Sequence, residues 1–153
     1  MTVMKSVAAT LVVLFPVLLA AEAHARAESP KAVLQEIYGQ VDAMCGGDGN
    51  GPAYDIVGIA NTYFEPTLAK KVGKISDGGP FDFDFLVDAQ DCQVTALDLS
   101  VVDDNGSTAT GHAEFQNFGE RRSIDLKMAK HGETLEVTDV VYRHRPFSLR
   151  AGE

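Results

Sequence analysis

The stretch that most constrains this chain is 81–102, where a loop of aromatic and acidic residues runs straight into an alternating strand. From Phe81 to Phe85, three phenylalanines alternate with two aspartates. An extended backbone sends successive side chains to opposite sides. We therefore predict that the rings anchor the loop, while Asp82 and Asp84 stay in solvent.

The same stretch predicts an irregular start to the strand. Leu97, Leu99 and Val101 alternate with polar residues, which is the pattern of a half-buried strand. Val94 has the opposite parity to Leu97. We therefore expect a bulge or a twist near Thr95 and Ala96, which would curve the sheet where it begins.

The remaining elements follow from apolar periodicity and turn residues. Ser29 before Pro30 is typical of a helix start, and apolar residues at helical spacing continue to about Met44. Further helices are predicted at 54–61 and from Glu65–Pro66 onward. Turns are predicted at 103–106, at Gly119–Glu120 and at 131–132. The pattern predicts an α+β fold in which N-terminal helices pack on a curved four-stranded antiparallel sheet.

The first 25 residues have the pattern of a signal peptide. Lys5 precedes the apolar run Val7–Ala21, and small residues follow at the positions that a signal peptidase reads. The run is shorter than the roughly 20 residues that span a bilayer, so no stable membrane anchor is expected after cleavage. The mature chain would begin at Arg26 or Glu28, with one domain over 28–150, in the periplasm or outside the cell.

Charge limits the classes of partner. The formal net charge is −9, whereas nucleic acids and anionic lipids are bound by clustered Lys and Arg. A basic protein or a small molecule fits this charge better. The charge also serves solubility alone in many proteins.

Cys45 and Cys92 are the only cysteines. In an oxidising compartment they have one intramolecular pairing, and the alternative is two buried free thiols. The three histidines outside the predicted signal peptide have no short ligand spacing with one another or with cysteine, so no metal site is expected. No phosphate or dinucleotide motif is present, and no cofactor is expected.

Several short segments together resemble a family of exported bacterial proteins of unknown function with the nuclear-transport-factor-2-like (NTF2-like, or cystatin-like) fold. The resemblance covers about Pro30 to Arg150 and departs from the family pattern at Leu135, where an aromatic residue is usual. It implies a curved sheet wrapped over the helices as a cone. The matching segments are Tyr63-Phe64, Leu68-Ala69, Phe83-Asp84, Ala89-Gln90-Asp91, Phe115-Gln116-Asn117, Val137-Thr138-Asp139-Val140 and Ser148-Leu149-Arg150.

The resemblance implies that an enzyme of this fold would use an Asp or His inside the cone as general base. His112 is one candidate because it lies mid-strand on the same face as Glu114, and histidine is a common general acid or base. The same face also carries Thr and Gln side chains, which is typical of an exposed sheet face. Asp91 and Asp139 are the other catalytic candidates, and the alternative is that they hold backbone groups or pair with arginine.

Two function classes remain. We expect an exported binding or interaction module without catalytic activity, which engages a basic envelope protein through the 81–91 loop or a small ligand in the cone. The resemblance adds homodimerisation through the open sheet face. The alternative is a dehydratase- or isomerase-like enzyme with His112 or an Asp as base. The candidate binding residues are Tyr63, Asp84, Asp88, Gln90 and Asp91.

Overall fold

The structure is a computed structural model that describes residues 29–47, 51–78 and 83–152. The predicted signal peptide lies outside these residues, as do Phe81 and Asp82 of the predicted loop. Three helices precede four strands in the described part of the chain.

The helices are α1 (Pro30–Cys45), α2 (Ile56–Tyr63) and α3 (Pro66–Ser76). The Ser29 hydroxyl caps α1, as predicted, by accepting a hydrogen bond from a backbone N–H of the first turn. The second helix is shifted by two residues from its predicted range, because the Asp55 side chain caps it.

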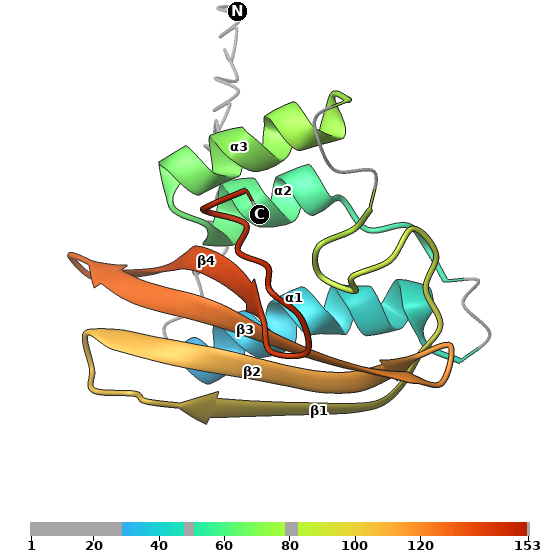
Figure 1. Cartoon of the computed structure of the whole chain (residues 1–153). Helices are drawn as coiled ribbons and strands as arrows, with labels where there is room; N and C mark the ends of the chain where they lie inside the picture. Colours follow the sequence, from blue (N-terminus) through green and yellow to red (C-terminus); the bar gives the residue numbers. More distant parts are fainter. Residues whose placement is uncertain (1–28, 48–50, 79–82, 153) are drawn as a thin grey trace, which may run out of the picture.

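The strands β1 (Val94–Val102), β2 (Thr108–Asn117), β3 (Glu120–His131) and β4 (Thr134–Tyr142) form one antiparallel sheet in the order β1-β2-β3-β4. Figure 1 shows α1 lying across one face of the sheet, with α2 and α3 above it. The predicted α+β class, with helices packed on a four-stranded antiparallel sheet, is confirmed.

The predicted bulge in β1 is also confirmed. The pairing register with β2 shifts between Thr95 and Asp98, and Ala96 has a φ of 51°. The extra residue reverses the parity, so that Val94 is buried and Leu97 still faces the helical layer as a half-buried residue.

The turn between β2 and β3 lies one residue earlier than predicted. Asn117 pairs with Glu120, so Phe118 and Gly119 form the turn, with φ values of 50° and 80°. Two-residue hairpin turns favour positive φ at both central positions because this matches the strand twist. The prediction of Gly119–Glu120 was wrong because Phe118 gave no sign of adopting such a φ.

The space between α1 and the sheet is filled. The largest fully buried side chains include Tyr38, Phe115 and Leu126. A Cβ added at Gly111 would lie 2.6 Å from Met128 Cε and 3.0 Å from Leu34 Cδ1. At this position the inner face of the sheet has no room even for a methyl group.

The predicted disulfide is present. Cys45, the last residue of α1, is bonded to Cys92, just before β1, and their Cα atoms are 5.2 Å apart. The bond joins the helical layer to the start of the sheet, and it fixes one end of the loop at 83–91, which we call the central loop.

After β4 the chain turns back along that strand. The N–H of Tyr142 donates to the carbonyl of Phe147, and the N–H of Leu149 donates to the carbonyl of Val140. This return places residues 143–147 beside the central loop, although about 55 residues separate them in sequence.

Candidate ligand pocket beside Asp84

The backbone of the central loop is held from two sides. The Tyr38 hydroxyl of α1 donates to the carbonyl of Leu86 at 3.2 Å, and the Tyr142 hydroxyl of β4 donates to the carbonyl of Phe85 at 2.9 Å. Both tyrosines are buried. The loop is therefore fixed to the core, and its side chains have defined positions.

A pocket of about 290 Å³ lies between this loop, the start of α2 and the end of α3. Figure 1 shows the loop beside these two helix ends. Among the described residues that line the pocket, only Asp84 is charged. The lining residues are Ile56, Val72, Ile75, Ser76, Phe83, Asp84, Phe85 and Gln90.

The carboxylate of Asp84 accepts hydrogen bonds from a side chain and from the backbone of its own loop. One oxygen accepts a hydrogen bond from the Tyr54 hydroxyl, and the other accepts one from the backbone N–H of Leu86 at 2.7 Å. No Lys, Arg or His of the described residues forms an ion pair with it. Asp84 is thus hydrogen-bonded but has no counter-ion.

The prediction that Asp84 stays in solvent was wrong. The backbone turns between Asp84 and Ala89, which form an isolated bridge, and Asp88 has a φ of 53°. An alternating pattern sends side chains to opposite sides only while the backbone is extended. Because this loop turns, Asp84 faces the pocket.

Burial has a clear effect on this group. It raises the pKa of Asp84 to about 6, although the backbone N–H groups of Leu86 and Val87 act in the opposite direction. Desolvation disfavours the ionised form of a carboxyl group, and no nearby cation offsets it here. At neutral pH, Asp84 is a carboxylate that lacks electrostatic compensation.

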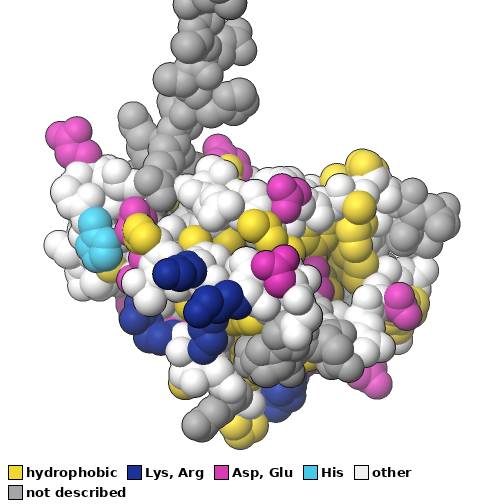
Figure 2. All heavy atoms as spheres, turned by 90° about the horizontal axis from the view of Figure 1, so that it is seen from above, with side chains coloured by type: hydrophobic (Ala, Val, Ile, Leu, Met, Phe, Trp, Pro, Cys, Tyr) yellow, Lys and Arg dark blue, Asp and Glu magenta, His cyan; other side chains and the backbone are white. Residues whose placement is uncertain are grey.

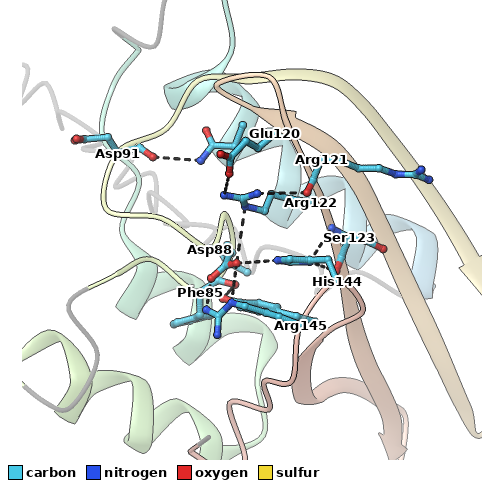
Figure 3. Close-up of polar contacts among 12 residues, drawn as sticks. Phe85, Asp88, Asp91, Glu120, Arg121, Arg122, Ser123, His144 and Arg145 are labelled. Carbon is cyan, nitrogen blue, oxygen red and sulfur yellow. Dashed lines mark hydrogen bonds and ion pairs between the residues drawn. The ribbon is translucent and has the colours of Figure 1, made fainter.

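Asp88, four residues further on, has the opposite surroundings (Figure 3). Its carboxylate is bonded to two groups of the Arg145 guanidinium, lies 2.8 Å from His144 Nε2, and lies 3.8 Å from Arg122 Nε. We call these four residues the Asp88 clamp. The Asp88 side chain is 8% exposed, whereas that of Arg145 is 43% exposed, so the clamp encloses a buried carboxylate with a cation that reaches the surface.

The clamp holds the Asp88 carboxyl group in its ionised form. Burial alone would raise the pKa of Asp88, but hydrogen bonds from Arg145 and His144, together with their charges, lower it below its usual value. The clamp also holds Arg122, whose Nη2 donates to Glu120 at 2.8 Å (Figure 3).

The clamp and the pocket share an aromatic wall. The Arg145 guanidinium lies 4.8 Å from the ring centroid of Tyr142 and 5.5 Å from those of Phe83 and Phe147. Phe83 also lines the pocket. The clamp therefore fixes one wall of the pocket through cation–π contacts.

The predicted binding residues divide between several places. Gln90 lines the same pocket as Asp84. Asp88 belongs to the clamp, and Asp91 is exposed, with its carbonyl accepting a hydrogen bond from the Asn117 amide. Tyr63 is not among the pocket residues, because its hydroxyl donates to Glu36 on α1 at 2.6 Å.

His112 lies on the face of the sheet that α1 does not cover, because its neighbours Ala113 and Phe115 point into the core. Its Nδ1 is 2.7 Å from Asp125 Oδ1. The side chains of this pair are 15% and 11% exposed. His112 is not among the residues that line the Asp84 pocket.

Asp139 has a structural role. Its carboxylate accepts hydrogen bonds from the Ser148 hydroxyl and the backbone N–H of Arg150, both at 2.8 Å. The expectation that Asp139 holds backbone groups is confirmed. It anchors the chain that returns along β4.

Sequence reasoning missed the partners of Asp88 and His112. His144 and Arg145 reach Asp88 only because the chain turns back after β4, and no local pattern signals this. Asp125 could have been found, since a turn at Phe118–Gly119 fixes the β2–β3 register and places it opposite His112.

Within the described ranges, no group of three or more His, Cys, Asp or Glu side chains is placed to hold a metal ion. The pocket instead offers one carboxylate, one amide and apolar walls, which are contacts for an organic ligand. A comparison with protein families, with curated proteins and with solved structures found no match for this chain. The resemblance to the exported NTF2-like family therefore remains a prediction.

Proposed function

We propose that this protein is an exported, non-catalytic binding module whose pocket beside Asp84 takes a small organic ligand. The observation that carries the proposal is a carboxylate that has no counter-ion in the described ranges and lies among apolar walls contributed by Ile56, Val72 and Ile75. Small-molecule sites typically combine apolar walls with few polar groups that fix orientation. The volume of about 290 Å³ is close to the lower end of the usual range of about 300–1,000 Å³.

Export is part of the proposal. It is supported by the disulfide between Cys45 and Cys92, which suits an oxidising compartment, and by the apolar run near the N-terminus. None of the helices in the described ranges has the length and hydropathy of a membrane span. The finer NTF2-like architecture is also proposed, on the order of the helices followed by a bulged antiparallel meander.

A small ligand is favoured over a basic protein partner. A basic partner would need acidic side chains that face outward from the central loop. Asp84 faces the pocket and Asp88 is neutralised by the clamp, which leaves Asp91 as the exposed acid among 83–91. On the face seen from above α3, acidic side chains are scattered and do not gather in one area (Figure 2).

Binding is also favoured over catalysis. A general base needs a second polar group that polarises the substrate. The Tyr54 hydroxyl, the neighbour of Asp84, already donates to that same carboxylate, and the other polar residues that line the pocket, Ser76 and Gln90, are exposed. His112, the other predicted base, is hydrogen-bonded to Asp125 on the face of the sheet opposite α1. Mass spectrometry of the ligand after incubation tests this choice, since a bound ligand should be recovered chemically unchanged.

The pocket itself can be tested by blocking it. Ser76 is exposed at the end of α3 and lines the pocket, so Ser76→Trp places an indole in it without disturbing the core. A library of small apolar molecules would be screened by NMR of methyl groups in the folded protein. We expect binders to shift the methyl signals of Ile56, Val72 and Ile75, and Ser76→Trp to abolish these shifts.

Lys74→Trp is the matched control, because it adds the same ring at an exposed position of α3 that does not line the pocket. It should bind like the unmodified protein. Binders that shift signals elsewhere, or that are insensitive to Ser76→Trp, would contradict the proposed site.

A further inference from the structure

The chemistry of the pocket indicates which ligand class it takes. In the described part of the chain, the Asp84 carboxylate interacts with the Tyr54 hydroxyl and with the backbone N–H groups of Leu86 and Val87, but with no cation. Moving a carboxylate out of water is costly, and a neighbouring cation offsets much of that cost. Asp88 has such neighbours in the guanidinium groups of Arg145 and Arg122. For Asp84, a cationic ligand would add the charge that the described residues do not supply.

The other groups around Asp84 do not provide a positive charge. Within the described ranges, the titratable groups that face it are the hydroxyls of Tyr54 before α2, Tyr38 of α1 and Tyr142 of β4. The pKa values of Tyr38 and Tyr142 are raised, chiefly by burial, so both stay neutral. Among the described residues, every group that acts on Asp84 is thus neutral or a hydrogen-bond donor, and the Asp84 carboxylate would repel an anionic ligand.

The walls of the pocket suit the apolar part of such a ligand. Phe83 lines the pocket, and the Arg145 guanidinium already lies 5.5 Å from its ring centroid. Because this ring already has a cation partner, we assign it apolar contact with the ligand and not a second cation–π contact. Ile56, Val72 and Ile75 offer apolar contact further along the pocket.

From these contacts we propose that the pocket binds a small organic cation, an ammonium group on an apolar body, with Asp84 as its counter-ion and Phe83 against its apolar part. This inference rests on the proposed function and specifies the ligand of that same pocket.

The test compares three probes of similar shape and different charge: 2-phenylethylamine, 2-phenylethanol and 3-phenylpropionate. Their dissociation constants would be measured by methyl NMR at pH 7.5 and pH 5. We expect the amine to bind at least ten-fold more tightly than the alcohol at pH 7.5, and the acid to bind most weakly. The amine should lose most of this advantage at pH 5, because the raised pKa of Asp84, about 6, leaves it largely protonated there.

Two substitutions locate the effect. Asp84→Asn should abolish the preference for the amine at pH 7.5, because it removes the charge and keeps the shape. Asp91→Asn makes the same change at an exposed acid of the central loop and should leave the preference intact. The pH dependence of the unmodified protein keeps the test decisive even if Asp84→Asn fails to fold.

The outcomes separate the two proposals. If the alcohol binds in the pocket as tightly as the amine, and neither pH nor Asp84→Asn changes this, the cation inference is overturned while the pocket stands. If none of the three probes shifts the pocket methyls, and Ser76→Trp changes no binding in the wider screen, both proposals are overturned.

Discussion

Asp84 and Asp88 lie four residues apart in one loop and have opposite surroundings. Asp88 is enclosed by Arg145, His144 and Arg122, and its pKa is lowered, against the effect of burial, by hydrogen bonds and charge from Arg145 and His144. Asp84 has no cationic partner among the described residues, and burial raises its pKa to about 6. The difference teaches that two acidic residues in one stretch of sequence can have different roles. Asp88 stabilises the fold, and Asp84, in our proposal, binds a ligand.

The two carboxylates also differ in their contribution to stability. The lowered pKa of Asp88 means that its stabilisation is present at neutral pH and is lost as pH falls through that pKa. The raised pKa of Asp84 has the opposite effect on the free energy of unfolding. The stabilisation is present at low pH, where Asp84 is protonated, and is lost as pH rises through about 6. A destabilising group at working pH is typical of functional sites.

The largest expected effect comes from the disulfide that fixes the loop holding both Asp84 and Asp88. Replacing Cys45 and Cys92 by serine removes a bond between residues 47 apart in sequence. The free energy of unfolding should fall by about 4 kcal/mol, because the unfolded chain gains entropy. Urea denaturation at pH 7 measures this. A loss under about 1 kcal/mol would contradict a role for the bond in fixing the loop.

Asp88→Asn should give the next largest effect. Asparagine keeps the shape and tolerates the φ of 53°, so the substitution removes only the charge. The free energy of unfolding at pH 7 should fall by about 2–3 kcal/mol, less than for a fully buried pair because Arg145 is partly exposed.

The matched control for this substitution is Asp91→Asn, at an exposed acid of the same loop. It should change the free energy of unfolding by less than about 0.5 kcal/mol. The difference between the unmodified protein and Asp88→Asn should shrink as pH falls below about 4. An effect that stayed constant down to pH 2 would show that charge is not its cause.

Asp84→Asn should have a smaller effect of the opposite sign. It should raise the free energy of unfolding at pH 7.5 by about 2 kcal/mol. The upper limit is about 3 kcal/mol, because the pKa of Asp84, about 6, lies about two units above the ordinary value and each unit corresponds to 1.36 kcal/mol. The two proteins should converge near pH 4, where Asp84 is protonated. Denaturation at several pH values measures this, and a loss of stability at pH 7.5 would refute the contrast with Asp88.

Tyr54→Phe should have the smallest effect. It removes the hydroxyl that donates to Asp84, and losing one such bond costs about 1 kcal/mol. The ionised carboxylate then has one donor fewer, so the pKa of Asp84 should rise further. Denaturation at pH 7.5 and an NMR titration of Asp84 measure the two changes. A fall in the pKa would show that the hydroxyl does not stabilise the charge.

Local patterns predicted much of the fold. The Ser29 cap, the bulge near Ala96 and the disulfide follow from residue type, side-chain parity and compartment, and all are present. These features depend on neighbours in sequence or, for the disulfide, on a single available partner. They could therefore be found without knowing the tertiary arrangement.

The site depended on long-range contacts and was predicted only in part. Asp84 and Gln90 were among the expected binding residues and do share a pocket. That Asp84 faces inward depends on a turn in the central loop, and the partners of Asp88 depend on the chain returning after β4. No periodic pattern in the sequence signals the turn or the returning chain, so the sequence alone did not distinguish Asp84 from Asp88.

The most direct measurement of the central claim is an NMR titration of the Asp84 side-chain carboxyl carbon, without and with 2-phenylethylamine. We predict a pKa of about 6 in the free protein, and a lower value when the amine is bound, because a cation favours the ionised form. A pKa near the ordinary value of about 3.9 in the free protein, or one that the amine leaves unchanged, would contradict the account.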